Sequence, residues 1–240
     1  MTTDPEFKAV LLDAAGTLLT VNPSVGHVYA DHAALYGFNV CANALNESFV
    51  VNWRAHRHRD GHGSPFHTSE TGERSWWHEL ALAVYSGAGA SAEFKTEYDR
   101  IFDSLYKRFA DPDVWRVYDD VVPALDDLRD RGIRLAVVSN WDSRLPLLLE
   151  RLGLSERFEF ILTSAEAGIS KPHPDIFLQA CRRLNLPQED VVHVGDSLEE
   201  DVDGAQAAGI RATLLDREGR WPNRPDAIRA LTDLSAPSRT

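Results

Sequence analysis

The chain has 240 residues, the length of one large domain or of a core domain with a smaller insertion. Its apolar fraction of 43% and aromatic fraction of 9% supply a full hydrophobic core, which excludes a globally disordered chain. The formal net charge of -12 argues against a general binder of nucleic acid or of anionic membranes, because such proteins need a basic face.

The first predicted element is a buried strand over residues 8–13, KAVLLD, which ends on Asp13. Gly16 and Thr17 follow in the sequence AAGT. The glycine permits a tight turn whose backbone N–H groups can point at an anion. Asp13 is therefore a candidate functional carboxylate at the end of a strand.

Two further signals indicate the compartment. The N-terminal residues are polar and acidic with no long apolar run behind them, which predicts neither a signal peptide nor a transmembrane helix. Cys41 and Cys181 are far apart in the sequence, which favours reduced thiols over a disulfide framework. We therefore expect a soluble, cytoplasmic protein.

A long helical stretch follows the first strand. Apolar residues recur at helical spacing in four segments, at 27–38, 43–59, 74–89 and 92–110. Residues 110–120 read as a return linker. We therefore predict a core domain formed by 1–20 and 111–240, with a helical cap domain inserted at 21–110.

The second half of the chain alternates strands with helices. Short runs rich in Val, Ile and Leu predict buried strands at 134–140, 158–164, 190–196 and 211–216. Helical patterns lie between them, and Ser197 with Glu200 forms a predicted capping box. This alternation predicts an α/β fold, a doubly wound parallel sheet of the Rossmann-like kind with helices on both faces.

Polar residues follow the predicted strands where each one ends. In parallel sheets, ligands bind at the carboxyl ends of the strands. Ser139 and Asn140 offer a hydroxyl and an amide there, and Lys171 offers an ammonium from the rigid segment SKPHPD. Asp196 and Asp201, together with Asp13, form a set of hard oxygen ligands of the type that Mg²⁺ prefers.

Four blocks in this order resemble the motifs of the haloacid dehalogenase-like (HAD) hydrolase superfamily. They are DAAGTL, VVSN, KPHPDIF and VGDSLEED, and the resemblance covers residues 7–20 and 110–216. One block alone would be a weak signal, whereas the ordered and correctly spaced set is specific.

The resemblance implies a Mg²⁺-dependent phosphatase that acts on a small phosphorylated metabolite. Asp13 would be the nucleophile that forms an aspartyl-phosphate, and Lys171 would neutralise charge on the phosphoryl group. The other implied roles are phosphate binding by Gly16, Thr17, Ser139, Asn140 and Lys171, and Mg²⁺ binding by Asp13, the backbone carbonyl of Ala15, Asp196 and, directly or through water, Asp201. The resemblance implies neither a nucleic-acid nor a membrane partner, and it leaves the oligomeric state open.

Ala15 departs from the family pattern. The phosphatases of the family normally carry Asp two residues after the nucleophile, where it protonates the leaving oxygen and then activates water. A positioned acid/base contributes roughly 10²–10⁴-fold to the rate. The chain is then either a slow or restricted phosphatase, or a protein that binds a phosphorylated ligand or a partner without turnover.

Two other chemistries of the superfamily fit less well. 2-Haloacid dehalogenases usually carry Tyr at this position and lack the acidic pair that Asp196 and Asp201 provide here. Phosphonoacetaldehyde hydrolases do carry Ala there, but they need a lysine early in the cap. Residues 21–94 contain no lysine.

Three features have a structural and a functional interpretation. The histidines of the segment WRAHRHRDGHGSPFH lack a convincing metal-ligand spacing, so they belong either to a solvated, partly cationic cap surface or to a segment that binds an anionic substrate and supplies the missing proton. Trp76 and Trp77 are interpreted as cap core rather than as a stacking site for substrate. His193, inside a predicted strand, is interpreted as a satisfied core histidine. The histidines in question are His56, His58, His62 and His67.

Overall fold

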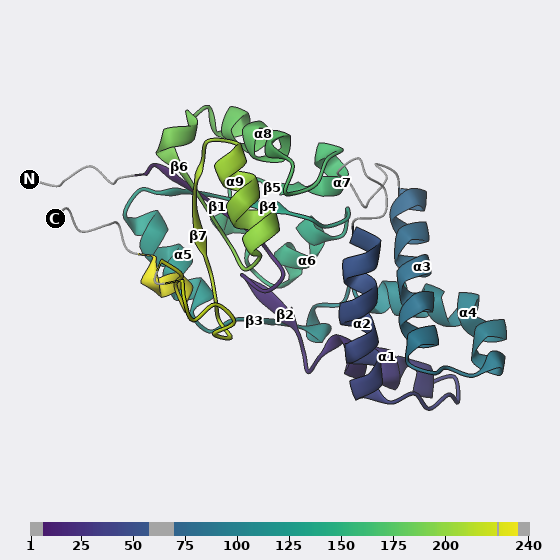
Figure 1. Cartoon of the computed structure of the whole chain (residues 1–240). Helices are drawn as coiled ribbons and strands as arrows, with labels where there is room; N and C mark the ends of the chain where they lie inside the picture. The colour runs from purple at the N-terminus through teal and green to yellow at the C-terminus, as the bar shows by residue number, and fades with distance from the viewer. Residues whose placement is uncertain (1–6, 58–69, 225, 235–240) are drawn as a thin grey trace, which may run out of the picture. The chain divides into compact units, whose positions relative to one another are not determined.

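The chain divides into two compact units in the computed structural model (Figure 1), which describes residues 7–57, 70–224 and 226–234. The core unit is formed by Met1–Leu19 and Val117–Thr240, and the cap unit by Thr20–Arg116. The sequence analysis placed these borders after residues 20 and 110.

The core unit contains a five-stranded sheet in the order β5-β4-β1-β6-β7. Every neighbouring pair in it is parallel, which confirms the predicted doubly wound α/β fold. Leu12 of β1 pairs with Val137 of β4 and with Val194 of β6, so the three central strands end at the same edge. The strands are β1 (Ala9–Leu12), β4 (Arg134–Ser139), β5 (Ile161–Thr163), β6 (Val191–Gly195) and β7 (Arg211–Leu214).

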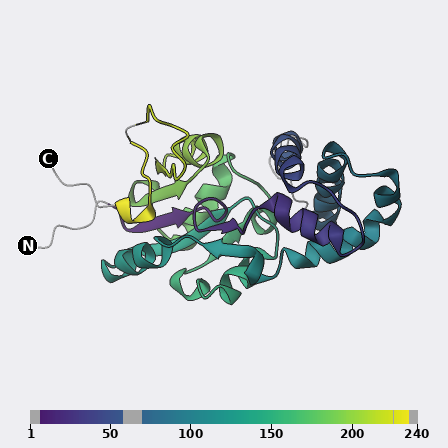
Figure 2. The same cartoon turned by 90° about the horizontal axis from the view of Figure 1, so that it is seen from below.

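Helices cover both faces of this sheet (Figure 2). On one face lie α5 (Val121–Asp130) and α6 (Leu145–Arg151), and on the other α8 (Pro174–Leu184) and α9 (Gly204–Ala207). Helix α8 begins with His173 as its N-cap and Pro174 in its first turn, where the fixed φ of proline suits a helix. Its buried stripe packs on the sheet and consists of Ile176, Phe177, Ala180, Cys181 and Leu184.

The helix predicted over residues 197–209 is in fact two elements. Leu198–Asp203 forms a π-helical turn, and α9 follows it. The backbone N–H groups of Asp201 and Val202 both donate to the Ser197 carbonyl, at 3.0 and 3.3 Å. The Ser197 hydroxyl also accepts from the N–H of Glu200 at 3.2 Å, which is one half of the predicted capping box. Such widened turns are frequent at functional sites.

Two short strands join the units, and the sequence analysis did not predict them. β2 (Leu19–Val21) pairs with β3 (Trp115–Val117) as a separate two-stranded sheet. Other short elements of the core and linkers are α7 (Ser164–Ala167) and the 3₁₀ turns Pro112–Val114, Ser155–Arg157, Gln188–Asp190 and Leu231–Asp233.

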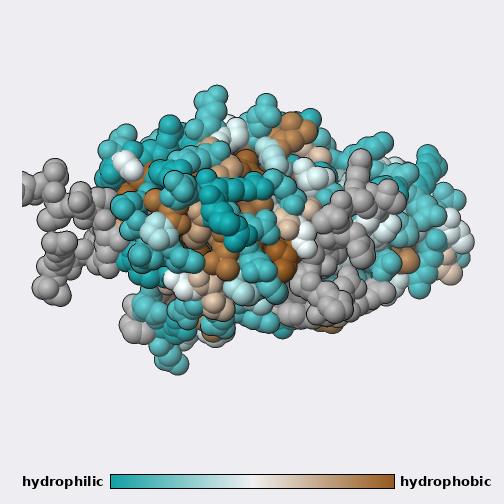
Figure 3. Space-filling model, turned by 90° about the horizontal axis from the view of Figure 1, so that it is seen from above, coloured by the Kyte–Doolittle hydropathy of each residue, from teal (hydrophilic) through white to brown (hydrophobic). Residues whose placement is uncertain are grey.

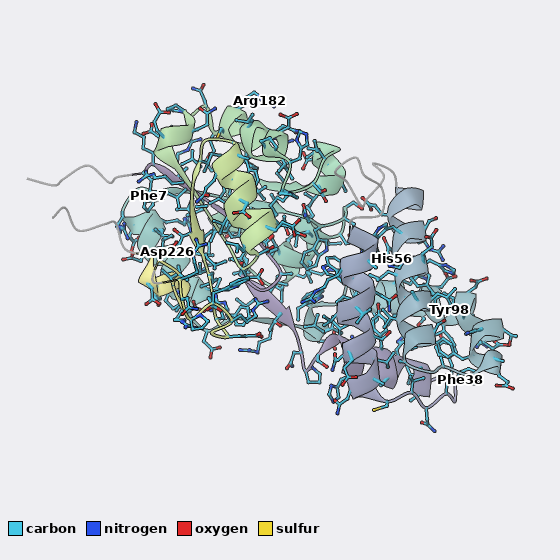
Figure 4. All side chains as sticks on the ribbon, viewed as in Figure 1. Phe7, Phe38, His56, Tyr98, Arg182 and Asp226 are labelled. Atoms are coloured by element: carbon cyan, nitrogen blue, oxygen red, sulfur yellow. The ribbon has the colours of Figure 1, made fainter. Side chains whose placement is uncertain are left out.

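The cap unit is helical, as predicted, and consists of α1 (Val25–Ala34), α2 (Ala42–Arg57), α3 (Glu70–Gly87) and α4 (Ala92–Arg108). Aromatic rings form its core. Tyr98, labelled in Figure 4, donates its hydroxyl to the His78 carbonyl at 2.7 Å. Trp76 is buried and meets Trp77 edge-to-face at 4.9 Å, which supports its interpretation as cap core.

Hydrophilic and hydrophobic side chains alternate over the face of the core unit seen from above (Figure 3). Within the described ranges, no helix has both the length and the apolar character that crossing a bilayer requires.

Candidate active site

The shared edge of the three central strands brings the predicted site residues of the core unit together. Asp13 follows β1 directly, and its N–H donates to the carbonyl of Val194 in β6 at 3.0 Å. Ser139 ends β4, and Asp196 follows β6. Asp13 and Ser139 are buried, so the candidate nucleophile lies at the bottom of the site rather than on the surface.

Lys171 bridges two carboxylates. Its Nζ lies 2.6 Å from Oδ1 of Asp13 and 2.5 Å from Oδ1 of Asp201. All three side chains are buried, where charged groups persist only when they are paired. The predicted nucleophile and the predicted lysine are therefore in direct contact.

Asn140 holds the segment that carries Lys171. Its Oδ1 accepts from the Lys171 N–H at 2.8 Å, and its Nδ2 donates to the Lys171 carbonyl at 2.9 Å and to Glu200 at 3.2 Å. The side-chain amide is therefore engaged with the protein, contrary to the expectation that it is offered to a phosphate oxygen. A phosphate-binding role of the Asn140 backbone stays a prediction.

The buried charges shift one another's pKa values. Burial raises the pKa of Asp13 above its usual range, and the Asp201 charge adds to this, whereas Lys171 and a hydrogen bond with Ser139 act in the opposite direction. The Lys171 ammonium holds the pKa of Asp201 well below its usual range, and the two carboxylates raise that of Lys171. Lys171 and Asp201 thus form a charged pair. Asp13 must lose its proton next to this pair, where Lys171 favours its ionised form and Asp201 opposes it.

The donor set fits a divalent cation. Asp13, Asp196 and Asp201 each offer a carboxylate oxygen, and these atoms lie within 4.8 Å of one another. Burial, followed by the charges of Asp13 and Asp201, raises the pKa of Asp196 to about 7. Three carboxylates at such short range repel one another, and a hard cation between them would relieve this repulsion.

Comparison with known proteins identifies the family. The model of the haloacid dehalogenase-like hydrolase family matches residues 7–209. The chain belongs to this family. It is 35% identical over 210 residues to human haloacid dehalogenase-like hydrolase domain-containing protein 3, covering 88% of this chain and 82% of the relative.

Two further HAD relatives are named as phosphatases. The glyceraldehyde 3-phosphate phosphatase of Methanopyrus kandleri is 34% identical over 153 residues, covering 54% of this chain and 63% of the relative. The crystal structure of a HAD phosphatase from Thermococcus onnurineus is 29% identical with a TM-score of 0.64, and the match covers 95% of this chain and 96% of that one.

The turn after Asp13 differs from its expected form. The N–H of Gly16 donates to the Leu19 carbonyl at 2.8 Å and that of Thr17 to the Ala14 carbonyl at 3.3 Å. Both amides are therefore engaged within the turn, which runs against the expectation that they face an anion. The Thr17 hydroxyl is buried and meets no partner among the described residues.

Gly16 has a different role that the structure shows directly. Its φ is +81°, and a Cβ placed on it would lie 2.7 Å from the carboxyl carbon of Asp196. A glycine is needed here because any side chain would displace that carboxylate. The side chain of Ala15, in contrast, is exposed, and its carbonyl as a metal ligand stays a prediction.

Two functional candidates escaped the sequence analysis, and a third, His193, was interpreted there as a core histidine. Arg220 donates to Oδ2 of Asp196 at 3.0 Å, Arg217 donates to the Thr17 carbonyl at 2.7 Å, and His193 contacts Asp201 at 2.9 Å. His193 could have been suspected, because it lies in β6 only three residues before Asp196. The two arginines lie in a C-terminal segment without a recognisable pattern.

Of the four cap histidines, the structure describes His56. His56, labelled in Figure 4, lies on α2 with Nδ1 2.9 Å from the Asn52 carbonyl. His58, His62 and His67 lie outside the described residues.

Proposed function

We propose that this HAD hydrolase is a phosphatase that acts on a small phosphorylated metabolite through an aspartyl-phosphate on Asp13. The observation that carries this proposal is the buried Lys171 ammonium, held within 2.6 Å of the Asp13 carboxylate. A cation at that point can neutralise an oxygen of a transferring phosphoryl group. The relative named as a glyceraldehyde 3-phosphate phosphatase supports a phosphorylated substrate.

The proposed reaction proceeds in two displacements. An oxygen of the Asp13 carboxylate attacks phosphorus, the bond between phosphorus and the leaving oxygen breaks, and the electron pair departs with that oxygen. Water then attacks the same phosphorus, which releases inorganic phosphate and restores the carboxylate. Lys171 and the Ser139 hydroxyl stabilise the charge on the phosphoryl oxygens throughout.

The proposed Mg²⁺ would be held by Asp13, Asp196 and the Ala15 carbonyl, with Asp201 direct or through water. When bound, it supplies positive charge that stabilises the phosphoryl oxygens in the transition state. Asp13 is buried and Asp196 is partly buried, so a bound cation would interact with their carboxylates more strongly than it does in bulk water.

Ala15 restricts the leaving groups that this mechanism handles well. With no carboxyl at this position, the leaving oxygen departs without a proton from the turn after Asp13. The leaving groups of acyl phosphates and aryl phosphates depart readily as anions. The leaving group of an alkyl phosphate is an alkoxide, which needs a proton. We therefore expect the first two classes to be the better substrates.

One observation favours a second candidate function. The same Ala15 is compatible with a protein that binds a phosphorylated ligand or a partner without turnover. Such a protein would retain affinity for inorganic phosphate at Lys171 while releasing no product.

A substrate panel distinguishes these proposals. Phosphate release is measured from acetyl phosphate, p-nitrophenyl phosphate and glyceraldehyde 3-phosphate, with and without Mg²⁺, beside phosphonoacetaldehyde and 2-chloropropionate. Asp13→Asn is the test variant. Asp190→Asn is the matched control, because Asp190 lies just before β6, at the opposite end of the strand from Asp196, and pairs with Lys8 at 2.8 Å.

The phosphatase proposal predicts Mg²⁺-dependent phosphate release that Asp13→Asn removes and Asp190→Asn retains. Turnover of the phosphonate or of the haloacid alone would instead support one of the other chemistries of the superfamily. Phosphate binding without any Asp13-dependent turnover would support the non-catalytic candidate.

A further inference from the structure

His193 is a fully buried histidine inside the central sheet, and the proposed reaction does not use it. It lies in β6 between Leu11 of β1 and Ala212 of β7. Its ring packs edge-to-face against Phe177 at 5.0 Å. A polar ring at such a position needs a partner, because burying it without one is costly.

The partner of His193 is Asp201. Nε2 of the ring lies 2.9 Å from Oδ1 of the carboxylate, whereas Nδ1 meets no partner among the described residues. An ionised carboxylate only accepts hydrogen bonds, so the hydrogen lies on Nε2. A hydrogen on Nδ1 would be a buried donor with nothing to receive it, which the structure disfavours.

The carboxylate of Asp201 is held by donors on both oxygens. Oδ1 accepts from Lys171 at 2.5 Å and from His193, and Oδ2 accepts from the Ser197 N–H at 2.9 Å. Gly195 lies against the same carboxylate, and a side chain there would collide with it. The group therefore has one available orientation.

Each donor has a different origin, which separates their roles. The Ser197 N–H belongs to the backbone of the π-helical turn, and Lys171 belongs to the loop that Asn140 holds. His193 stands on the rigid central strand. A donor on a strand fixes a position more firmly than donors on loops.

We propose that His193 is a positioning residue, which donates its Nε2–H to Asp201 and so fixes the carboxylate that holds Lys171 against Asp13. It acts through Asp201 and touches no reacting atom. This inference rests on the proposed role of Lys171 in phosphoryl transfer, and it adds a residue to which no role was assigned.

Loss of this donor has a defined consequence. Oδ1 of Asp201 would keep one donor instead of two, and its carboxylate could turn about the bond to Cβ. The Lys171 ammonium would then lose its fixed distance to Asp13, although every charge remains. Removing an outer partner of this kind typically costs roughly 10–100-fold in activity or in metal affinity.

Three variants separate positioning from simple destabilisation. His193→Leu removes the donor and keeps an apolar side chain. His193→Gln restores a side-chain N–H, because the amide nitrogen of Gln reaches about as far as Nε2 of His. Val191→Ala is the matched control, since Val191 is fully buried and begins the same strand, at the end opposite to Asp196.

Two measurements report on the Lys171 ammonium and on Mg²⁺ binding without requiring turnover. The chain contains four lysines, and Lys171 is buried. A buried ammonium group exchanges its hydrogens slowly with water, so that of Lys171 should give a ¹H–¹⁵N correlation in the NMR spectrum. The Lys171→Met variant identifies this correlation by its loss. Titration calorimetry measures the Kd for Mg²⁺. Turnover of acetyl phosphate and the thermal unfolding midpoint are measured on the same samples.

The inference predicts that His193→Leu broadens or removes the Lys171 correlation and lowers kcat/KM by roughly 10–100-fold. His193→Gln should recover most of both effects. Val191→Ala should lower the unfolding midpoint while leaving the correlation and kcat/KM in place.

Several results would overturn it. One is an unchanged Lys171 correlation in His193→Leu, and another is an equal loss of activity in Val191→Ala at the same loss of stability. Should His193→Leu not fold, the imidazole ¹⁵N spectrum of the unmodified protein decides, because a hydrogen on Nδ1 contradicts the proposal and one on Nε2 supports it. If the unmodified protein shows no turnover but His193→Leu still alters the Lys171 correlation, the result counts against the phosphatase proposal and not against this inference.

Discussion

In the proposed mechanism, Ala15 decides which leaving groups the site can handle. The residue is exposed and lies two positions after the buried Asp13, which leaves room for a larger side chain. The motif pattern alone revealed this substitution, because the missing carboxyl is a matter of residue identity. Whether another group replaces it depends on side-chain positions that no local pattern encodes.

Introducing the missing acid should therefore raise turnover. We expect Ala15→Asp to increase kcat for alkyl phosphates by about 10-fold or more, within the roughly 10²–10⁴-fold that a positioned acid/base supplies. Acyl phosphates should gain little, because their leaving groups need no proton. The comparison is made by steady-state phosphate release on both substrate classes.

Ala15→Asn is the control for this experiment. It has the same shape as Asp but donates no acidic proton, and it should leave both rates near those of the unmodified chain. Equal gains with Asn and Asp would show that the effect is steric and would contradict the assignment of Ala15 as a lost acid.

Sequence patterns predicted which side chains converge better than they predicted the contacts of those side chains. Asp13, Ser139 and Asp196 converge because parallel strands end at a common edge, which the alternation of strands and helices implies, and Lys171 and Asp201 reach the same place from the following loop and turn. The engagement of the Asn140 side chain with the Lys171 backbone could not be predicted in this way. It depends on the exact course of two loops that are distant in the sequence.

At the scale of elements, the strands were predictable and their short connections were not. The four strands after Gly132 and the strand at Ala9–Leu12 carry strong apolar patterns. β2 and β3 have three residues each, too few to show a period. The π-helical turn at Leu198–Asp203 also escaped notice, because its residues favour a regular helix equally well.

Arg217 links the turn after Asp13, the start of α5 and the C-terminal segment within the core unit. Its guanidinium donates to the Thr17 carbonyl at 2.7 Å and to Asp120 at 2.9 Å, and it lies 4.0 Å from the centre of the Tyr118 ring. Asp120 in turn accepts from the Leu231 N–H at 2.6 Å. The turn after Asp13 is thus tied to the start of α5 and to the C-terminal segment.

Removing this link should loosen the turn that follows the nucleophile. We expect Arg217→Ala to lower the free energy of unfolding by about 1.5–3 kcal/mol, the scale of a hydrogen bond to a charged group that is largely buried. Hydrogen exchange at residues 14–19 should accelerate. Denaturant unfolding and exchange measured by mass spectrometry provide the two readouts.

Arg224→Ala is a suitable comparison, because Arg224 forms an exposed pair with Asp226 at 2.9 Å. Exposed pairs of this kind contribute about 0–1 kcal/mol. If Arg217→Ala costs no more than Arg224→Ala and leaves exchange unchanged, the link does not stabilise the turn.

At the scale of the whole molecule, the three carboxylates of the site repel one another, and a bound cation would reduce this repulsion. Burial raises the pKa of Asp196 to about 7 in the folded protein, from its ordinary value of 3.8 in the unfolded chain. Between these values the folded protein binds a proton that the unfolded chain does not. The contribution of Asp196 to stability therefore falls as the pH rises through this window, and Asp13 contributes with the same sign.

Mg²⁺ should reverse this loss, and it should do so in a pH-dependent way. A cation competes with the proton on Asp196, so its binding weakens as the pH falls below about 7. We expect Mg²⁺ to raise the unfolding midpoint clearly at about pH 8 and much less at about pH 5.5. Saturation at 100 times the Kd would correspond to about 2.7 kcal/mol.

Calorimetric melting with and without Mg²⁺ at the two pH values tests this expectation. Asp196→Asn serves as the control and should abolish the Mg²⁺ effect at both. A midpoint shift that persists in Asp196→Asn, or that is larger at the lower pH, would place the cation elsewhere.

The most direct test of the central claim is chemical identification of the phosphorylated residue. The protein is mixed with acetyl phosphate and Mg²⁺, quenched in acid and reduced with borohydride, which converts an aspartyl-phosphate into homoserine. Peptide mass spectrometry then locates the modified residue. We predict homoserine at position 13 and its absence from Asp13→Asn; phosphate release with no modification at Asp13 would contradict the account.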